Sequence, residues 1–132
     1  MSHLRSALVG ALGALIAAQA GAAFAAQREA FTPQAFGAAQ AAGRPILVDV
    51  AANWCPICHA QEPIIEKLSA DPKFDQLVIF RLDFDAQRDA WRGMGVRMQS
   101  TLIAFHGTRE TARSVGETQA GPIAQVLAAS LR

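Results

Sequence analysis

Residues 54–59 read W-C-P-I-C-H and hold both cysteines of the 132-residue chain. Two cysteines separated by two residues can close a disulfide and open it again by thiol–disulfide exchange. The same string fits C-x-x-C-H, the pattern to which a c-type haem is covalently attached. A pair of thiolates also suits soft metal ions such as copper and zinc. The segments that position Cys55 and Cys58 must decide among these three chemistries.

The residues on either side of the cysteine pair predict a strand followed by a helix. Residues 46–52 (I-L-V-D-V-A-A) form an apolar run with β-branched residues, which is typical of a strand buried on both faces. Apolar residues recur at helical spacing over 56–69, and Pro56 suits the first helical position. Cys55 would then lie at the helix N-terminus, where unpaired N–H groups and the positive end of the helix dipole favour a thiolate. Cys58 lies one turn further along, within disulfide-bonding reach.

Strands and helices alternate along the rest of the chain. Thr32 as N-cap and Pro33 as first helical residue predict a short helix that ends before Gly43. The other predicted elements are a strand at 77–84, a helix at 85–92, a strand at 101–106, an edge strand at 110–115 and a helix at 122–131. Alternation implies parallel crossovers, and the last two strands form a hairpin. The sequence therefore predicts an α/β domain with a central mixed four-stranded sheet flanked by helices.

The first 25 residues have the composition of an export signal. Residues 6–26 contain no charge and are mostly Ala, Leu and Gly, after a single arginine near the start. The small residues of A-F-A at 23–25 predict cleavage after Ala25. A retained membrane anchor is the alternative, because the apolar run is about long enough to span a bilayer. The predicted organisation is a cleaved signal peptide (1–25), an N-terminal helix with its lead-in (26–43) and the main domain (44–132).

The charge of the chain and its predicted export limit the classes of partner that we expect. The signal holds one of the 12 basic residues and none of the 11 acidic ones, so the exported chain carries 11 of each. Because no basic cluster stands out, we expect no nucleic-acid partner. Export predicts a periplasmic protein, and a dithiol there rests as a disulfide unless a donor keeps it reduced. The predicted partners are therefore protein disulfide substrates and a membrane or soluble thiol electron donor.

Several offsets around the cysteine pair match those of a known family. The matching features are Asp49 six residues before Cys55, Pro63 five residues after Cys58, R-L-D-F-D at 81–85 and G-V-R-M-Q-S-T-L-I-A-F-H-G at 95–107. With these features the chain, from about residue 44 to 131, resembles the thioredoxin superfamily. The resemblance implies a thioredoxin-like three-layer sandwich, thiol:disulfide oxidoreductase activity, a monomer, no cofactor and no bound metal.

The resemblance also assigns roles to individual residues. Cys55 would attack the substrate disulfide, and Cys58 would resolve the mixed disulfide. Asp49 would be a buried carboxylate whose pKa is raised by desolvation, so that it can take the proton of Cys58. Arg81 is a candidate partner for Asp49. The residues that would shield the sulfurs or hold the substrate are Trp54, Pro56, Ile57, Gln99, Ser100 and Thr101.

The chain departs from the family pattern at Ser100. The family has a cis-proline at this position, in a loop that faces the cysteines and holds the substrate backbone. A cis bond before a residue other than proline costs about 3–4 kcal/mol, so we expect the Gln99–Ser100 bond to be trans in a reshaped loop. The departure concerns substrate binding and leaves the dithiol chemistry intact.

Other functions of the cysteine pair remain as alternatives. A structural disulfide across so short a loop would constrain the unfolded chain little. A copper or zinc carrier would use Cys55, Cys58 and His59 or a methionine, which is one ligand short of a closed zinc site. Haem attachment would use His59 and Met94 or Met98 as iron ligands, but the motif would then follow a buried strand. The predicted function is disulfide exchange with exported proteins, preferentially as a reductase.

Overall fold

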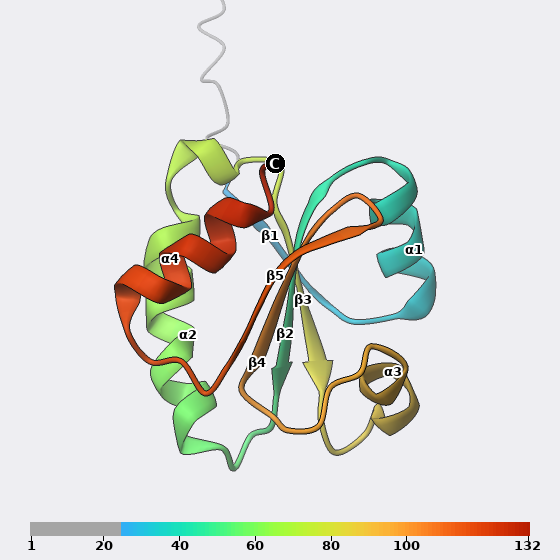
Figure 1. Cartoon of the computed structure of the whole chain (residues 1–132), viewed down its shortest axis with the longest axis vertical. Coiled ribbons are helices and arrows are strands. Elements are labelled where there is room, and N and C mark those ends of the chain that lie inside the picture. The colour runs from blue at the N-terminus through green and yellow to red at the C-terminus, as the bar shows by residue number, and fades with distance from the viewer. Residues whose placement is uncertain (1–24) are drawn as a thin grey trace, which may run out of the picture.

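The computed structural model describes residues 25–132, which form a mixed sheet in the order β1-β3-β2-β4-β5 (Figure 1). The strands are β1 (Gln27–Ala30), β2 (Pro45–Ala51), β3 (Val78–Asp83), β4 (Thr101–His106) and β5 (Arg109–Val115). Strands β1, β2 and β3 run parallel, and β4 is antiparallel to both β2 and β5. The predicted α/β class is confirmed, with five strands in place of four. The predicted signal peptide lies outside the described residues, apart from Ala25.

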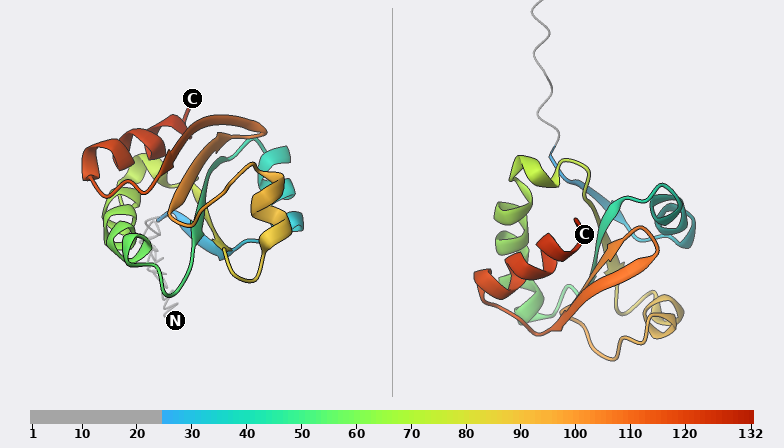
Figure 2. Two further views of the ribbon diagram at one scale, coloured as in Figure 1. Left: turned by 60° about the horizontal axis from the view of Figure 1, so that its bottom comes forward. Right: turned by 45° about the horizontal axis from the view of Figure 1, so that its top comes forward.

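Helices cover both faces of the sheet and complete three layers. Helices α2 (Pro56–Ser69) and α4 (Ala120–Ala129) lie on one face, and α1 (Pro33–Ala41) and α3 (Arg88–Gly93) lie on the other (Figures 1 and 2). A short 3-10 helix (Pro72–Phe74) follows α2 and leads to β3. None of the helices within residues 25–132 has the length and apolar character needed to cross a bilayer.

Two side chains set helix boundaries. The Thr32 hydroxyl accepts the N–H of Ala35 at 3.1 Å, which confirms the predicted N-cap of α1. The predicted helix at 85–92 begins later, at Arg88. The reason is that the Asp83 carboxylate accepts the N–H groups of Asp85 and Ala86, both at 2.9 Å, and so holds the residues after β3 in a turn.

Strand β1 is the element that the sequence did not predict. It reads Q-R-E-A, and all four side chains are exposed, so no alternation of apolar and polar residues marks it. Its place in the sheet comes from backbone pairing alone, with Gln27 opposite Val78 and Ala30 opposite Arg81. β1 therefore falls within the segment predicted as a lead-in to the first helix.

The alternation of side chains along β2 decides which residues face the cysteines. All seven residues of β2 are buried. Val48 and Val50 pack in the core under α1 and α3, whereas Leu47 packs under α2 and α4 with Ile65. Because side chains two apart in a strand share a face, Asp49 points toward the α2 side, like Leu47 before it and Ala51 after it. Ala51 itself packs against Cys55 and Cys58.

Candidate active site

The cysteine pair lies where β2 gives way to α2, as the sequence predicted. Cys55 is the N-cap of α2, with extended backbone, and its Sγ accepts the N–H of Cys58 at 3.0 Å. The exposed Pro56 occupies the first helical turn, where its missing N–H costs nothing. The two cysteines form a disulfide with their Cα atoms 5.3 Å apart, a separation typical of disulfides. Both cysteines are buried: the exposed fraction is 1% for Cys55 and 4% for Cys58.

The residues next to the two buried cysteines in the sequence include exposed apolar side chains. Trp54, immediately before Cys55, is 57% exposed, and its indole Nε1–H donates to a carboxylate oxygen of Asp85 at 2.8 Å. Ile57, between the cysteines, is 41% exposed, and Met98 is exposed too. Trp54 and Ile57, next to the two cysteines in the sequence, therefore present apolar surface to solvent beside the disulfide.

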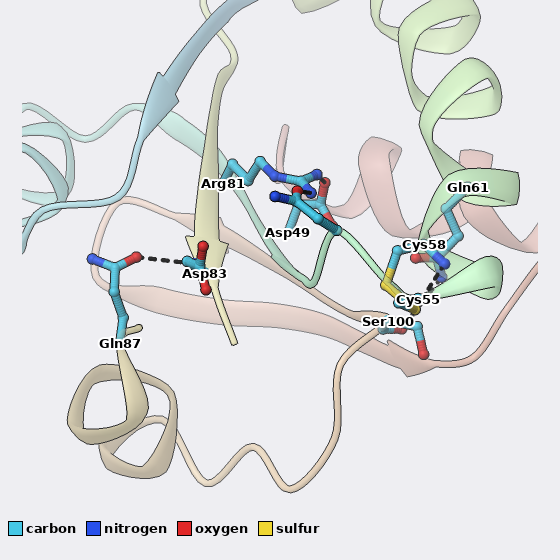
Figure 3. A network of polar contacts seen from close by, with 9 residues as sticks. Asp49, Cys55, Cys58, Gln61, Arg81, Asp83, Gln87 and Ser100 are labelled. Atoms are coloured by element: carbon cyan, nitrogen blue, oxygen red, sulfur yellow. Dashed lines mark hydrogen bonds and ion pairs between the residues drawn. A yellow bond between two sulfur atoms is a disulfide. The ribbon is translucent and has the colours of Figure 1, made fainter. Parts of the chain in front are cut away.

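Asp49 lies in the interior beside α2, as predicted. Burial raises the pKa of its carboxyl to about 6, while the positive charges of Arg81 and Arg28 oppose the rise and Glu62 adds to it. The nearest charge partner is Arg81, whose Nη1 lies 4.0 Å from Asp49 Oδ2 (Figure 3). Arg81 also donates to the side-chain oxygen of Asn53 at 3.3 Å. The predicted pairing of Asp49 with Arg81 is therefore present, although the two charged groups are too far apart for a hydrogen bond.

A cavity of about 620 Å³ reaches Asp49 from the β1 edge of the sheet, which is the edge opposite to β5. Its walls include Asp49, Arg81, Glu62 of α2, and Arg28 and Glu29 of β1. Glu62 lies one turn after Cys58, so the cavity borders the same stretch of α2 as the dithiol. Since Arg28, Glu29 and Glu62 are exposed, water can enter and reach the carboxyl of Asp49.

The loop before β4 has the reshaped form expected from Ser100. All peptide bonds of residues 25–132 are trans, and Ser100 has φ +60°, an uncommon conformation for a residue with a side chain. The Ser100 hydroxyl donates to the carbonyl of Gln99 at 2.5 Å, and the Thr101 hydroxyl donates to the carbonyl of Met98 at 2.7 Å. Ser100 and Thr101 are buried, and Gln99 is half-buried. Figure 3 shows Ser100 on the side of the cysteine pair.

Gln61 belongs to the site although the sequence did not single it out. It lies three residues after Cys58 on α2 and is 1% exposed. Its amide Nε2 donates to the carbonyl of Ser100 at 3.3 Å and to that of Glu117 at 2.8 Å. A signal did exist: Cys58, Gln61 and Ile65 have the i, i+3, i+7 spacing of one helix face, so a polar residue on that apolar stripe needs buried partners.

The ligands proposed for haem or metal are scattered. His59 is exposed on α2, and Met98 is exposed near Ser100. Met94 packs against the core under α1 and α3, on the other face of the sheet. Within residues 25–132, no three or more His, Cys, Asp or Glu side chains are grouped so that they could hold a metal ion. The two cysteines are joined to each other in a disulfide at the start of α2.

Comparison with known proteins agrees with this geometry. The family model described as Thioredoxin matches residues 27–129. Thioredoxin-1 of Saccharomyces cerevisiae is 33% identical over 99 residues, which cover 75% of this chain and 93% of that protein. A thioredoxin of Aspergillus fumigatus is 29% identical over 72 residues, which cover 54% of this chain and 66% of that protein.

Among solved structures, Trxlp from Edwardsiella tarda superposes with a TM-score of 0.74 at 40% identity. The match covers 76% of this chain and 98% of that one. The sequence match, the fold and the disulfide at the start of α2 all indicate the same family. The chain belongs to the thioredoxin family of thiol-disulfide oxidoreductases.

Proposed function

We propose that this protein reduces disulfide bonds of exported proteins through Cys55 and Cys58. The observation that carries the proposal is the bond from the N–H of Cys58 to Sγ of Cys55 at the start of α2. When the pair is reduced, the same N–H and the helix dipole stabilise a thiolate on Cys55, which is the attacking form in disulfide exchange. The exposed Trp54 and Ile57 beside it offer an apolar surface to the substrate.

The reaction has two exchange steps. The Cys55 thiolate attacks one sulfur of the substrate disulfide, forms a mixed disulfide, and expels the other sulfur as a thiolate that takes up a proton. Cys58 then loses its proton, attacks Sγ of Cys55, and expels the second substrate thiolate. The substrate gains two electrons, which the cysteine pair loses as its disulfide closes. Of the two protons that the substrate thiolates take up, one balances the proton lost by Cys58 and the other comes from solvent, because Cys55 reacts as a thiolate.

Asp49 is proposed as the group that accepts the proton of Cys58. With a pKa of about 6, it is mostly ionised at neutral pH and can act as a base. Asp49 shares the face of β2 with Ala51, which belongs to the same buried cluster as Cys58. The neighbouring cavity opens the carboxyl of Asp49 to solvent, so a proton that it takes up can pass on to water.

The direction of electron flow and the compartment belong to the same proposal. The predicted signal at residues 1–25 supports a periplasmic protein. An exported reductase must be reduced again after each turnover, so we propose a thiol electron donor, membrane-bound or soluble, as the second partner.

The reduction potential of the purified protein tests the direction. Equilibration with glutathione or dithiothreitol buffers, followed by thiol titration, should give a value near about −270 mV, the range of reductases. A value near about −120 mV, the range of strong disulfide oxidants, would overturn the reductase proposal while leaving the dithiol chemistry in place. Reduction of insulin disulfides under the same conditions should follow the potential.

A further inference from the structure

The amide of Gln61 is held in one orientation by its buried partners. Both groups that it contacts, the carbonyls of Ser100 and Glu117, are acceptors, so only the NH₂ group can face them. Its own oxygen, Oε1, is buried and has no hydrogen-bond partner among residues 25–132. A leucine or methionine would fill the same space on this apolar helix face without an unpaired oxygen. The two donated bonds are what distinguishes glutamine here.

These bonds join three segments that meet beside the dithiol. Gln61 lies one turn after Cys58, Ser100 lies in the loop before β4, and Glu117 lies in the segment between β5 and α4. The Ser100 carbonyl also accepts the N–H of Gly116 at 3.0 Å. The Ser100 loop is thus bonded both to the active-site helix and to the segment after β5.

The Ser100 loop has no proline ring, and it is held by hydrogen bonds, among them the bond from the Thr101 hydroxyl to the carbonyl of Met98 and the bond from the Gly116 N–H to the carbonyl of Ser100. A proline would fix the loop through its ring, whereas Ser100 has φ +60° and is held locally by its hydroxyl bond to Gln99. A residue with a side chain keeps this conformation only when the surroundings over-determine it. The Gln61 amide is the side chain that reaches this loop from the dithiol helix.

We propose that Gln61 is a positioning residue that sets the Ser100 loop at the correct distance from Cys55, so that the loop can hold the backbone of an extended disulfide substrate. The inference rests on the proposed function, because it concerns how that same site binds protein substrates. Gln61 does not touch the reacting sulfurs in this role. It acts through the loop, and small disulfides that make no backbone contacts do not depend on it.

The experiment replaces Gln61 by methionine, which has a similar length and no donor. Steady-state reduction is measured with insulin as extended substrate and with 5,5′-dithiobis(2-nitrobenzoate) as small substrate. We expect KM for insulin to rise about three- to tenfold, the loss that follows from removing one or two hydrogen bonds, with kcat nearly unchanged. The rate with the small disulfide and the reduction potential should stay within about twofold and a few millivolts of wild type, since the helix N-terminus is intact.

Gln125→Met is the matched control, because Gln125 is exposed on α4. It should leave KM for insulin unchanged. If Gln61→Met does not fold, Gln61→Asn takes its place: the shorter stem keeps an amide that can reach at most one of the two carbonyls, and a smaller rise in KM is expected. Amide hydrogen exchange at Gly116 should be faster in either variant, because the bond to Ser100 loses its support.

The outcomes separate the two proposals. A folded Gln61 variant that loses activity equally with both substrates, or changes neither, would overturn the positioning role. A wild-type protein that reduces neither substrate would overturn the proposed reductase function. If the measured potential marks an oxidant, the same comparison is made with a reduced peptide as substrate, and the rise in KM is still expected.

Discussion

Asp49 keeps an ionisable group where its strand neighbours Val48 and Val50 are apolar and fully buried. Its folded-state pKa of about 6 lies above the ordinary value of 3.8, so the native state binds the proton more tightly than the unfolded chain. The stability that this provides is fully present below pH 3.8 and is lost as the pH rises through 6. At neutral pH the ionised carboxylate therefore lowers the free energy of unfolding.

Asp49→Asn should accordingly raise the free energy of unfolding at pH 7.5. The difference between pKa values of about 6 and 3.8 corresponds to about 3 kcal/mol at most. Denaturant unfolding of the oxidised variant should also show a weaker pH dependence between pH 4 and 6. The same variant should resolve mixed disulfides more slowly at neutral pH, because the base for Cys58 is gone. Equal stability of variant and wild type at pH 7.5 would argue against a buried carboxylate that destabilises the native state when it is ionised.

The two cysteines should behave differently when replaced one at a time. Cys55→Ser removes the nucleophile at the start of α2 and should abolish disulfide reduction, because serine at this position is not ionised near neutral pH. Cys58→Ser keeps the nucleophile but cannot release the substrate, so mixed disulfides should accumulate. Non-reducing gels and mass spectrometry of the captured adducts check this. Adducts on the Cys55→Ser variant in place of the Cys58→Ser variant would reverse the assigned roles.

At the scale of elements, the loop before β4 gives a prediction about backbone conformation. Proline requires φ near −65°, whereas Ser100 has φ +60°. Ser100→Pro should therefore force the loop to rebuild and lower the free energy of unfolding by about 1–3 kcal/mol. Ser100→Gly should be tolerated better, since glycine adopts positive φ without a steric penalty. Urea unfolding of the two variants side by side tests this, and a proline variant as stable as the glycine variant would show that the loop accepts another form.

The β2–α2 unit was predictable because its signals are local. An apolar run, a cysteine before Pro56 and a helical stripe lie within one stretch of about 25 residues. Strand β1 was not predictable in this way, because its four exposed residues carry no pattern and its place depends on pairing with β3. The same holds for Gln61, whose partners lie 39 and 56 residues away in sequence. The serine in place of proline at position 100 predicted a changed loop, but no local pattern predicted its positive φ.

For the whole molecule, the proposed compartment, the substrates and the electron donor all depend on export. The predicted cut after Ala25 falls just before β1, so cleavage would leave every strand of the sheet intact. Expression of the full chain in a bacterial host should yield a periplasmic protein whose intact mass corresponds to an N-terminus at Ala26. Cell fractionation and mass spectrometry decide the question. A full-length chain found in the membrane fraction would favour the retained anchor instead.

The parallel direction of β1 and β2 fixes where the chain enters relative to its sulfurs. Gln27 pairs at the beginning of β3, where its N–H donates to the Leu77 carbonyl at 2.9 Å, whereas Cys55 follows the far end of β2. One strand length, roughly 20 Å, separates these two ends of the sheet. A chain tethered to a bilayer at residue 25 would hold its dithiol away from the lipid, facing the water phase. A lipid-embedded electron donor would then need a protruding domain to reach the sulfurs, whereas a released chain could turn its active end toward the membrane.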